Sequence, residues 1–363
     1  MKIAAINCRQ ILCTRFLILS ALFVSVLVTS CKTQHETFTN PLLPSGADPW
    51  SIYKNGFYYY THTMGDRLLI WKTKSIADLK TAKHKTVFLP PAGTPYSKGL
   101  WAPEIHFIQG KWYMYFAADN GKNETHRLYV LENDSKNPMK GNWVFKGKVQ
   151  EPSDKWAIDG SVFEHQGQLY LIWSGWESDT NGRQDLYISK MKNPWTVEGN
   201  RVRISSPVYD WETHGDLHDA NNPPHVSVNE GPQFLGSNDH VYIIYSASGC
   251  WTEYYSLGML SALATDNLLD SSSWKKYSQP VFKMSSENGV YAPGHNSFFK
   301  SPDGTQDWIL YHANSAPGQG CGRNRSPRAQ MFTWNADGSP DFGTPVKTGV
   351  AIAAPSHKKK KRN

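Results

Sequence analysis

The stretch WAIDGSVFEHQGQLYLIWSG, residues 156–175, decides the fold of this 363-residue chain. It holds two runs rich in β-branched and aromatic residues, and Gln166-Gly167 between them supplies a tight turn. Two such runs around a glycine turn predict an antiparallel β-hairpin. Asp159 stands at the front of the first run, where a hairpin alone has no need of an acid.

Four more segments along the chain repeat this plan of a strand, a tight turn and an apolar strand. Strand-like runs such as RLLIWKTK and HRLYVLEN lie between the hairpins, and we find no sustained helical periodicity. The first strands are expected to begin 55 to 71 residues apart, at Asp48, Glu104, Asp159, Glu230 and His295. Because this period suits a four-stranded propeller blade, the sequence predicts an all-β, five-bladed β-propeller, as a single domain over residues 38–356.

Equivalent positions of the five first strands would meet near one mouth of the propeller channel, since the innermost strand of each blade lines that channel. Four of these positions are acids. The alternative is that each acid merely caps a strand end, but carboxylates gathered together repel one another and are usually tolerated only where a function requires them. Two facing carboxyl groups suit glycoside hydrolysis, in which one protonates the departing oxygen and the other activates water.

The motifs that open the repeats resemble those of the family 43 glycoside hydrolases, five-bladed propellers that cleave furanose and pyranose linkages with inversion. The matching segments are Ala47-Asp48-Pro49, Trp101-Ala102-Pro103-Glu104, Ile158-Asp159-Gly160-Ser161, Asn229-Glu230-Gly231-Pro232 and Gly294-His295-Asn296. The resemblance covers essentially the whole mature chain. It implies that Asp48 is the general base, that Glu230 is the general acid, and that Asp159 tunes and orients Glu230.

The resemblance also implies roles for residues beside the three acids. His295 would lie on the propeller axis beside an ion or an ordered water. Calcium is one candidate for that ion, but it prefers several oxygen ligands, so waters would have to complete the site. No cofactor is expected to be required for the chemistry. Glu104 would act as a structural hydrogen-bond acceptor, and Trp101 would form an apolar wall of the sugar pocket.

One arginine of the late run GCGRNRSPRAQMFTW is expected to contact a sugar hydroxyl near the base. The candidates are Arg323, Arg325 and Arg328, and the family pattern favours Arg328 because Arg-Ala-Gln leads into a strand.

The expected function is an exo-acting α-L-arabinofuranosidase that releases arabinose from plant arabinan or arabinose-decorated cell-wall polysaccharide. GADPW and PRAQMFTWNADGSPDFG resemble exo-acting arabinofuranosidases more than xylosidases. The second β-sandwich domain that xylosidases of the family often carry is not expected here. A β-xylosidase and an endo-arabinanase are the alternatives within the family. A non-catalytic surface glycan-binding lipoprotein is the alternative outside it, although binding alone does not need all three acids.

The N-terminus predicts a lipoprotein signal peptide over residues 1–30. Basic residues precede an apolar run, residues 16–28, that is too short for a comfortable membrane span. Val28-Thr29-Ser30-Cys31 resembles a bacterial lipobox, and a plain signal peptide with an incidental cysteine is the alternative. We expect a lipid on Cys31 to anchor the protein to the membrane of a bacterial cell envelope, in the periplasm or on the outer surface, with residues 31–37 as a short linker.

The charge and the cysteine content limit which partners and which cellular compartment are expected. The net charge of +7 is inflated at both ends, and a basic tail such as residues 357–363 is more often solvated than bound to phosphates, so no nucleic-acid partner is expected. Cys250 and Cys321 are the cysteines that would remain after processing and lipidation. An even pair in an oxidising compartment is expected to form a disulfide.

Overall fold

The computed structural model describes residues 36–218, 222–237 and 239–357. The predicted signal peptide, Cys31 and the basic residues 358–363 lie outside the described residues, as does Asn238 of one predicted turn. Among the residues that are described, no helix has the length and apolarity that a membrane crossing needs.

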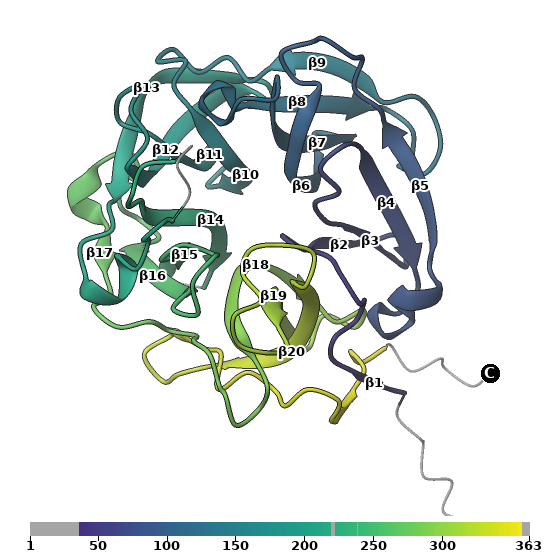
Figure 1. Cartoon of the computed structure of the whole chain (residues 1–363). Coiled ribbons are helices and arrows are strands. Elements are labelled where there is room, and N and C mark those ends of the chain that lie inside the picture. The colour runs from purple at the N-terminus through teal and green to yellow at the C-terminus, as the bar shows by residue number, and fades with distance from the viewer. Residues whose placement is uncertain (1–35, 219–221, 238, 358–363) are drawn as a thin grey trace, which may run out of the picture. The chain divides into compact units, whose positions relative to one another are not determined.

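Antiparallel strands build five blades around a common axis (Figure 1). The first two blades are β2 (Trp50–Lys54), β3 (Phe57–Thr61), β4 (Leu68–Thr73) and β5 (Lys83–Phe88), then β6 (Lys98–Ile108), β7 (Lys111–Asp119), β8 (Arg127–Asn133) and β9 (Val144–Lys148). The third and fourth are β10 (Ala157–His165), β11 (Gln168–Gly175), β12 (Arg183–Asn193) and β13 (Thr196–Ser205), then β14 (Ser227–Gly236), β15 (His240–Ala247), β16 (Ser256–Leu263) and β17 (Lys275–Lys276). The fifth is β18 (Tyr291–Lys300), β19 (Asp307–Asn314), β20 (Ser326–Trp334) and β21 (Pro340–Asp341).

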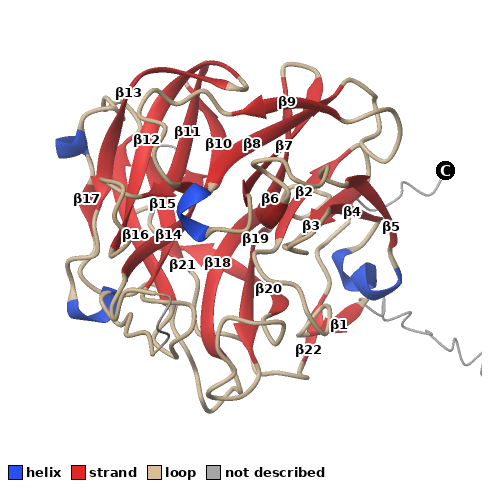
Figure 2. Cartoon of the chain, turned by 45° about the horizontal axis from the view of Figure 1, so that its top comes forward, coloured by secondary structure: helices blue, strands red, loops and turns tan. Residues whose placement is uncertain are grey.

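The predicted all-β, five-bladed propeller is confirmed. The innermost strands β2, β6, β10, β14 and β18 surround the axis in Figure 1. Figure 2 shows that the rest of the described chain is loops and a few short helical turns. The helical turns are η1 (Ile76–Thr81), η2 (Asn123–Thr125), η3 (Asp210–Glu212) and η4 (Ser271–Ser273). The domain limits, residues 38–356, stay a prediction.

Two strand pairings between blades or chain ends help to hold the ring together, besides side-chain packing. β1 (Thr37–Thr39) pairs antiparallel with β22 (Ala351–Ala353), which joins the beginning of the domain to its end. β12 and β14 pair in parallel over two residues each, so that the third and fourth blades form one eight-stranded sheet. The other three blades are separate four-stranded sheets.

The hydrophobic core is divided among the interfaces between neighbouring blades. Five clusters of buried residues occur, and each contains side chains from two adjacent blades. Trp112, Trp173 and Trp308 are among the largest fully buried side chains, and they belong to three different clusters. Much of the tryptophan content therefore packs one blade against the next.

Three of the five hairpin turns predicted along the chain have the required backbone geometry. Type I′ turns need positive φ at both central residues. The pairs that satisfy this are Asn55-Gly56 (φ 52° and 80°), Gln109-Gly110 (49° and 84°) and Gln166-Gly167 (50° and 74°).

The innermost strands begin in other places than the sequence analysis expected. β6 starts at Lys98, well before Glu104, whereas Asp48 lies in a bend ahead of β2. In the four inner strands other than β2, β-bulges shift the register near the repeated residues. A bulge adds an unpaired residue that re-aims a side chain, so a strand can continue on both sides of it.

Candidate active site

One mouth of the axis opens into a cavity of about 500 Å³ that contains most of the predicted site residues. It is lined by Asp48, Trp101, Asp159, Glu230 and His295, together with Arg325. A second cavity, of about 460 Å³, is lined by the opposite ends of the inner strands and by none of these residues. The titratable groups therefore converge at one mouth.

Backbone conformation aims the acids into this cavity. Asp48 and Asp159 have φ of 56° and 57°, and His295 has a φ of 47°. Such values are uncommon for residues other than glycine and are maintained only where the surrounding structure imposes them. In the fourth blade Gly231, with a φ of 56°, takes this conformation directly after Glu230. The same irregularity thus recurs from blade to blade, at or directly after a residue that lines the site.

Asp48 is surrounded by hydrogen-bond donors and positive charge. Its Oδ1 lies 3.1 Å from Nη1 of Arg325 and 3.3 Å from Nδ1 of His295. The hydroxyl of Thr63 donates to Oδ2 at 2.5 Å, and the backbone N–H of Asp48 donates to Nδ1 of His312 at 3.0 Å. Burial alone would raise the pKa of Asp48, but these neighbours outweigh it and hold the pKa well below its usual value. Asp48 is therefore a carboxylate throughout the neutral range.

Glu230 has the opposite tendency. Burial raises its pKa to about 7, and the charge of Asp48 adds to the rise. The hydroxyl of Tyr255 donates to Oε1 of Glu230 at 2.8 Å and acts against the rise, because it stabilises the charged form. Glu230 can therefore carry a proton near neutral pH.

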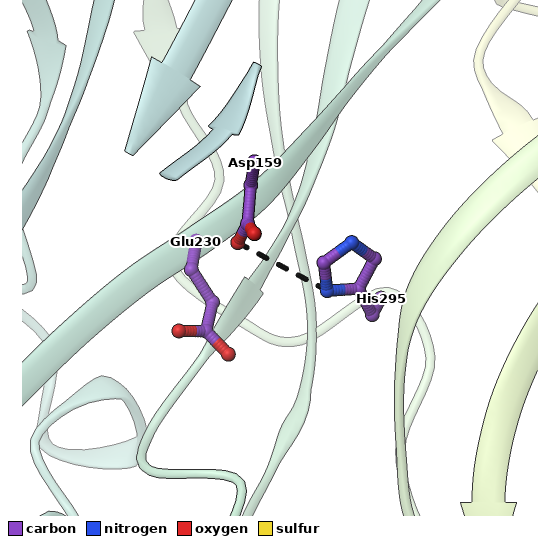
Figure 3. A group of neighbouring side chains, drawn as sticks. All are labelled: Asp159, Glu230 and His295. Atoms are coloured by element: carbon purple, nitrogen blue, oxygen red, sulfur yellow. Dashed lines mark ion pairs between the residues drawn. The ribbon is translucent and has the colours of Figure 1, made fainter. Parts of the chain in front are cut away.

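Asp159 lies beside Glu230 (Figure 3). Its Oδ2 accepts a hydrogen bond from the backbone N–H of Gly231 at 2.9 Å, and this contact ties Asp159 to the backbone next to Glu230. The same oxygen lies 4.0 Å from Nδ1 of His295. Burial, and then the nearby charges of Glu230 and Asp48, raise the pKa of Asp159 well above its usual value. Asp159 and Glu230 therefore compete for protons as a pair.

The donor set around His295 does not fit a calcium ion held by protein groups alone. One ligand atom each from Asp159, Glu230 and His295 lie within 4.8 Å of one another. Calcium takes six to eight oxygen ligands, whereas this group offers an imidazole nitrogen and two carboxylates that already accept hydrogen bonds. Burial lowers the pKa of His295, and the charge of Asp48 acts against this shift. An axial ion stays a prediction.

Two neighbours of the acids lie where the sequence analysis expected them. Glu104 is buried, and its carboxylate accepts hydrogen bonds from His106, at 2.8 Å, and from Gln233. Trp101 lines the cavity and stacks on His126, with ring centroids 4.0 Å apart.

The arginine that reaches the cavity is Arg325, and not Arg328. Arg328 is fully buried, and its guanidinium donates to the hydroxyls of Thr348 and Ser315, both at 2.7 Å. It does not line the cavity. Arg325 precedes β20, so its side chain is free to reach Asp48, whereas Arg328 lies within β20 and points into the blade.

Other residues of the site could not be recognised from the sequence. Tyr255 and Thr63 contact the acids from outside the repeated motifs. The expected disulfide between Cys250 and Cys321 is confirmed, and both cysteines line the cavity, as does Trp251. Cysteine count predicted the bond, but not its place beside the acids.

Comparison with known proteins agrees with this geometry. The profile described as Glycosyl hydrolases family 43 matches residues 38–340. The chain belongs to this family. Family 43 glycosidases invert configuration and need no cofactor for catalysis.

Relatives named as α-L-arabinofuranosidases are similar over most of the chain. An extracellular exo-α-(1→5)-L-arabinofuranosidase of Streptomyces avermitilis is 41% identical over 89% of this chain and 66% of its own length. α-L-Arabinofuranosidase 43 of Humicola insolens is 34% identical over 92% of this chain and 69% of its own. The chain thus spans about two thirds of the length of these relatives.

A solved family 43 structure has the same fold. The crystal structure of an α-L-arabinofuranosidase from Lactobacillus brevis superposes with a TM-score of 0.79 and 36% identity. The superposition covers 86% of this chain and 98% of that one.

Proposed function

We propose that this glycosidase is an exo-acting α-L-arabinofuranosidase, with Asp48 as general base, Glu230 as general acid and Asp159 as the residue that tunes and orients Glu230. One observation supports these roles above the others. The two carboxyl groups have pKa values driven in opposite directions, below the usual value for Asp48 and to about 7 for Glu230. Carboxyls whose pKa values are separated in this way suit a base and an acid that work at the same pH.

The proposed reaction is a single displacement. Asp48, as carboxylate, accepts a proton from a water molecule as the water attacks the anomeric carbon. Glu230 donates its proton to the glycosidic oxygen as that bond breaks. Because water attacks the face opposite to the departing oxygen, arabinose is released with inverted configuration. The hydroxyl of Thr63 and the guanidinium of Arg325 donate hydrogen bonds to the Asp48 carboxylate and hold it in place.

The substrate part of the proposal is supported by the names of the relatives and by Trp101, which offers an aromatic wall against a sugar. The test is paired hydrolysis of an aryl α-L-arabinofuranoside and an aryl β-D-xyloside, with the product anomer followed by proton NMR. We expect turnover of the arabinoside with inversion. Preference for the xyloside would favour a β-xylosidase, and internal cleavage of arabinan would favour an endo-arabinanase. Binding of arabino-oligosaccharides without turnover would favour the glycan-binding alternative.

The upper pH limit of kcat/KM is expected to shift in opposite directions in two variants. Because Glu230 must be protonated, kcat/KM is expected to fall above about pH 7. Tyr255→Phe removes a hydrogen bond that stabilises the carboxylate, so the pKa of Glu230 rises and this limb moves to higher pH. Asp159→Asn removes a group whose negative charge opposes the charge on Glu230, so the pKa of Glu230 falls and the limb moves to lower pH. Shifts in the same direction would contradict this account of the acid.

We further propose that the protein is exported and carries a lipid on Cys31. The disulfide supports export, because such bonds persist in oxidising compartments. Cys31→Ala is expected to move the protein from the membrane fraction to the soluble fraction and to abolish labelling with a radioactive fatty acid. Unchanged membrane association of the variant would overturn the anchor.

A further inference from the structure

Part of the cavity wall on the side of the proposed general acid is formed by residues 250–255, in the loop between β15 and β16. Cys250 and Trp251 line the cavity at the start of this loop. At its end, Tyr255 donates its hydroxyl to Glu230. The loop that supports Glu230 therefore also shapes the space next to it.

Two bonds tie this loop to the loop between β19 and β20, residues 315–325. The first is the Cys250–Cys321 disulfide, and the second is the backbone N–H of Gly318, which donates to the carboxylate of Glu253 at 2.7 Å. The second loop also carries Arg325, which contacts Asp48. The clasp, by which we mean these two bonds, thus links the Glu230 side of the cavity to the Asp48 side.

Trp251 is held firmly within the clasped loop. Its indole N–H donates to the carbonyl oxygen of Asp216 at 2.9 Å. Its ring also packs on Gly249, where a Cβ atom would lie 2.3 Å from the indole. A side chain fixed at both its ring nitrogen and its face loses little freedom when a ligand stacks on it.

The direction of the proposed reaction decides which part of the substrate meets this wall. In an inverting displacement the water attacks from one face and the leaving group departs from the other, beside the general acid. The sugar that departs must therefore lie against the elements around Glu230, of which loop 250–255 is one. Aromatic faces suit the flat apolar faces of sugar rings.

We propose that Trp251 forms the binding subsite for the leaving-group sugar, the second pentose unit of an arabinose-containing oligosaccharide, and that the clasp sets its position. This inference rests on the proposed function. It makes Trp251 a specificity-determining residue for oligosaccharides, and the Cys250–Cys321 pair a positioning device for it.

The test compares two substrates that share the arabinose to be released. An α-1,5-linked arabinobiose has a sugar as its leaving group, whereas methyl α-L-arabinofuranoside has only methanol. Trp251→Ala is expected to lower kcat/KM for the disaccharide about tenfold, mainly through KM, and to change the methyl glycoside by less than about twofold. Trp251→Phe is expected to recover most of the loss.

Tyr254→Ala is the matched control. Tyr254 lies on the same loop, is 55% exposed and does not line the cavity, so turnover of neither substrate is expected to change.

Replacing both Cys250 and Cys321 by serine is expected to raise KM for the disaccharide selectively. Reduction of the wild-type disulfide should have the same effect.

The outcomes separate this inference from the proposed function. Equal losses on both substrates in Trp251→Ala, or no loss on either, would overturn the subsite and leave the arabinofuranosidase proposal standing. Failure of the wild-type protein to cleave either substrate would overturn the proposed function, and the subsite with it.

Discussion

Replacing Asp48 with asparagine is expected to lower kcat on arabinosides about 10³- to 10⁴-fold. This loss is the upper part of the range that a positioned general base typically contributes. The amide keeps the shape of the side chain and can still accept a hydrogen bond from Thr63, but it cannot take a proton from water. Steady-state kinetics on arabinobiose measure the effect. Calorimetry with an arabino-oligosaccharide is expected to show that binding persists.

A second replacement tests whether the loss arises from the missing base. Asp48 has a φ of 56°, which glycine adopts without strain, so Asp48→Gly keeps the backbone and leaves a gap where the carboxylate was. Added azide is expected to enter that gap and to form a glycosyl azide of inverted configuration from an activated aryl arabinoside. Retention of more than about a tenth of kcat by Asp48→Asn would contradict the assignment of the base.

Glu230→Gln is expected to affect substrates according to their leaving groups. Arabinobiose needs a proton on its departing oxygen, so its kcat/KM should fall about 10²- to 10⁴-fold. A dinitrophenyl arabinoside has a leaving group that departs without protonation, so its loss should stay below about tenfold. The ratio of the two losses is the measured quantity.

Glu104→Gln is the control for Glu230→Gln. Glu104 is a buried glutamate at the equivalent repeat position of another blade. Its carboxylate accepts hydrogen bonds from His106 and Gln233 and does not line the cavity. Any loss in this variant is expected to be the same for both substrates. Equal losses in Glu230→Gln itself would show that Glu230 is not the proton donor.

The propeller and the convergence of its acids were predictable because both follow from a repeat. A repeated unit occupies equivalent places in each blade, so Asp48, Asp159, Glu230 and His295 had to meet near the axis. The bulges that aim these residues were not predictable. Positive φ at Asp48 and Asp159 is imposed by the packing around them, and an aspartate in the sequence does not by itself predict it.

The supporting residues of the site could not be predicted because they belong to loops that follow no repeat. Arg325 and Arg328 are three positions apart, and only the start of β20 between them decides which one reaches Asp48. Tyr254 and Tyr255 are adjacent, yet one is exposed and the other bonds to Glu230. Such choices depend on where a strand begins.

The pairing of β12 with β14 bears on how the site responds to thermal motion. These backbone hydrogen bonds end at Val228, two residues before Glu230, and they join the blade of Asp159 to the blade of Glu230. Asp48 lies in a bend ahead of β2, and the sheet β2–β5 that follows it pairs with no strand of another blade among the described residues. Breathing of the ring on warming should therefore change the gap between base and acid before it changes the spacing of Asp159 and Glu230. The turnover rate should fall while the pH at which activity declines stays fixed.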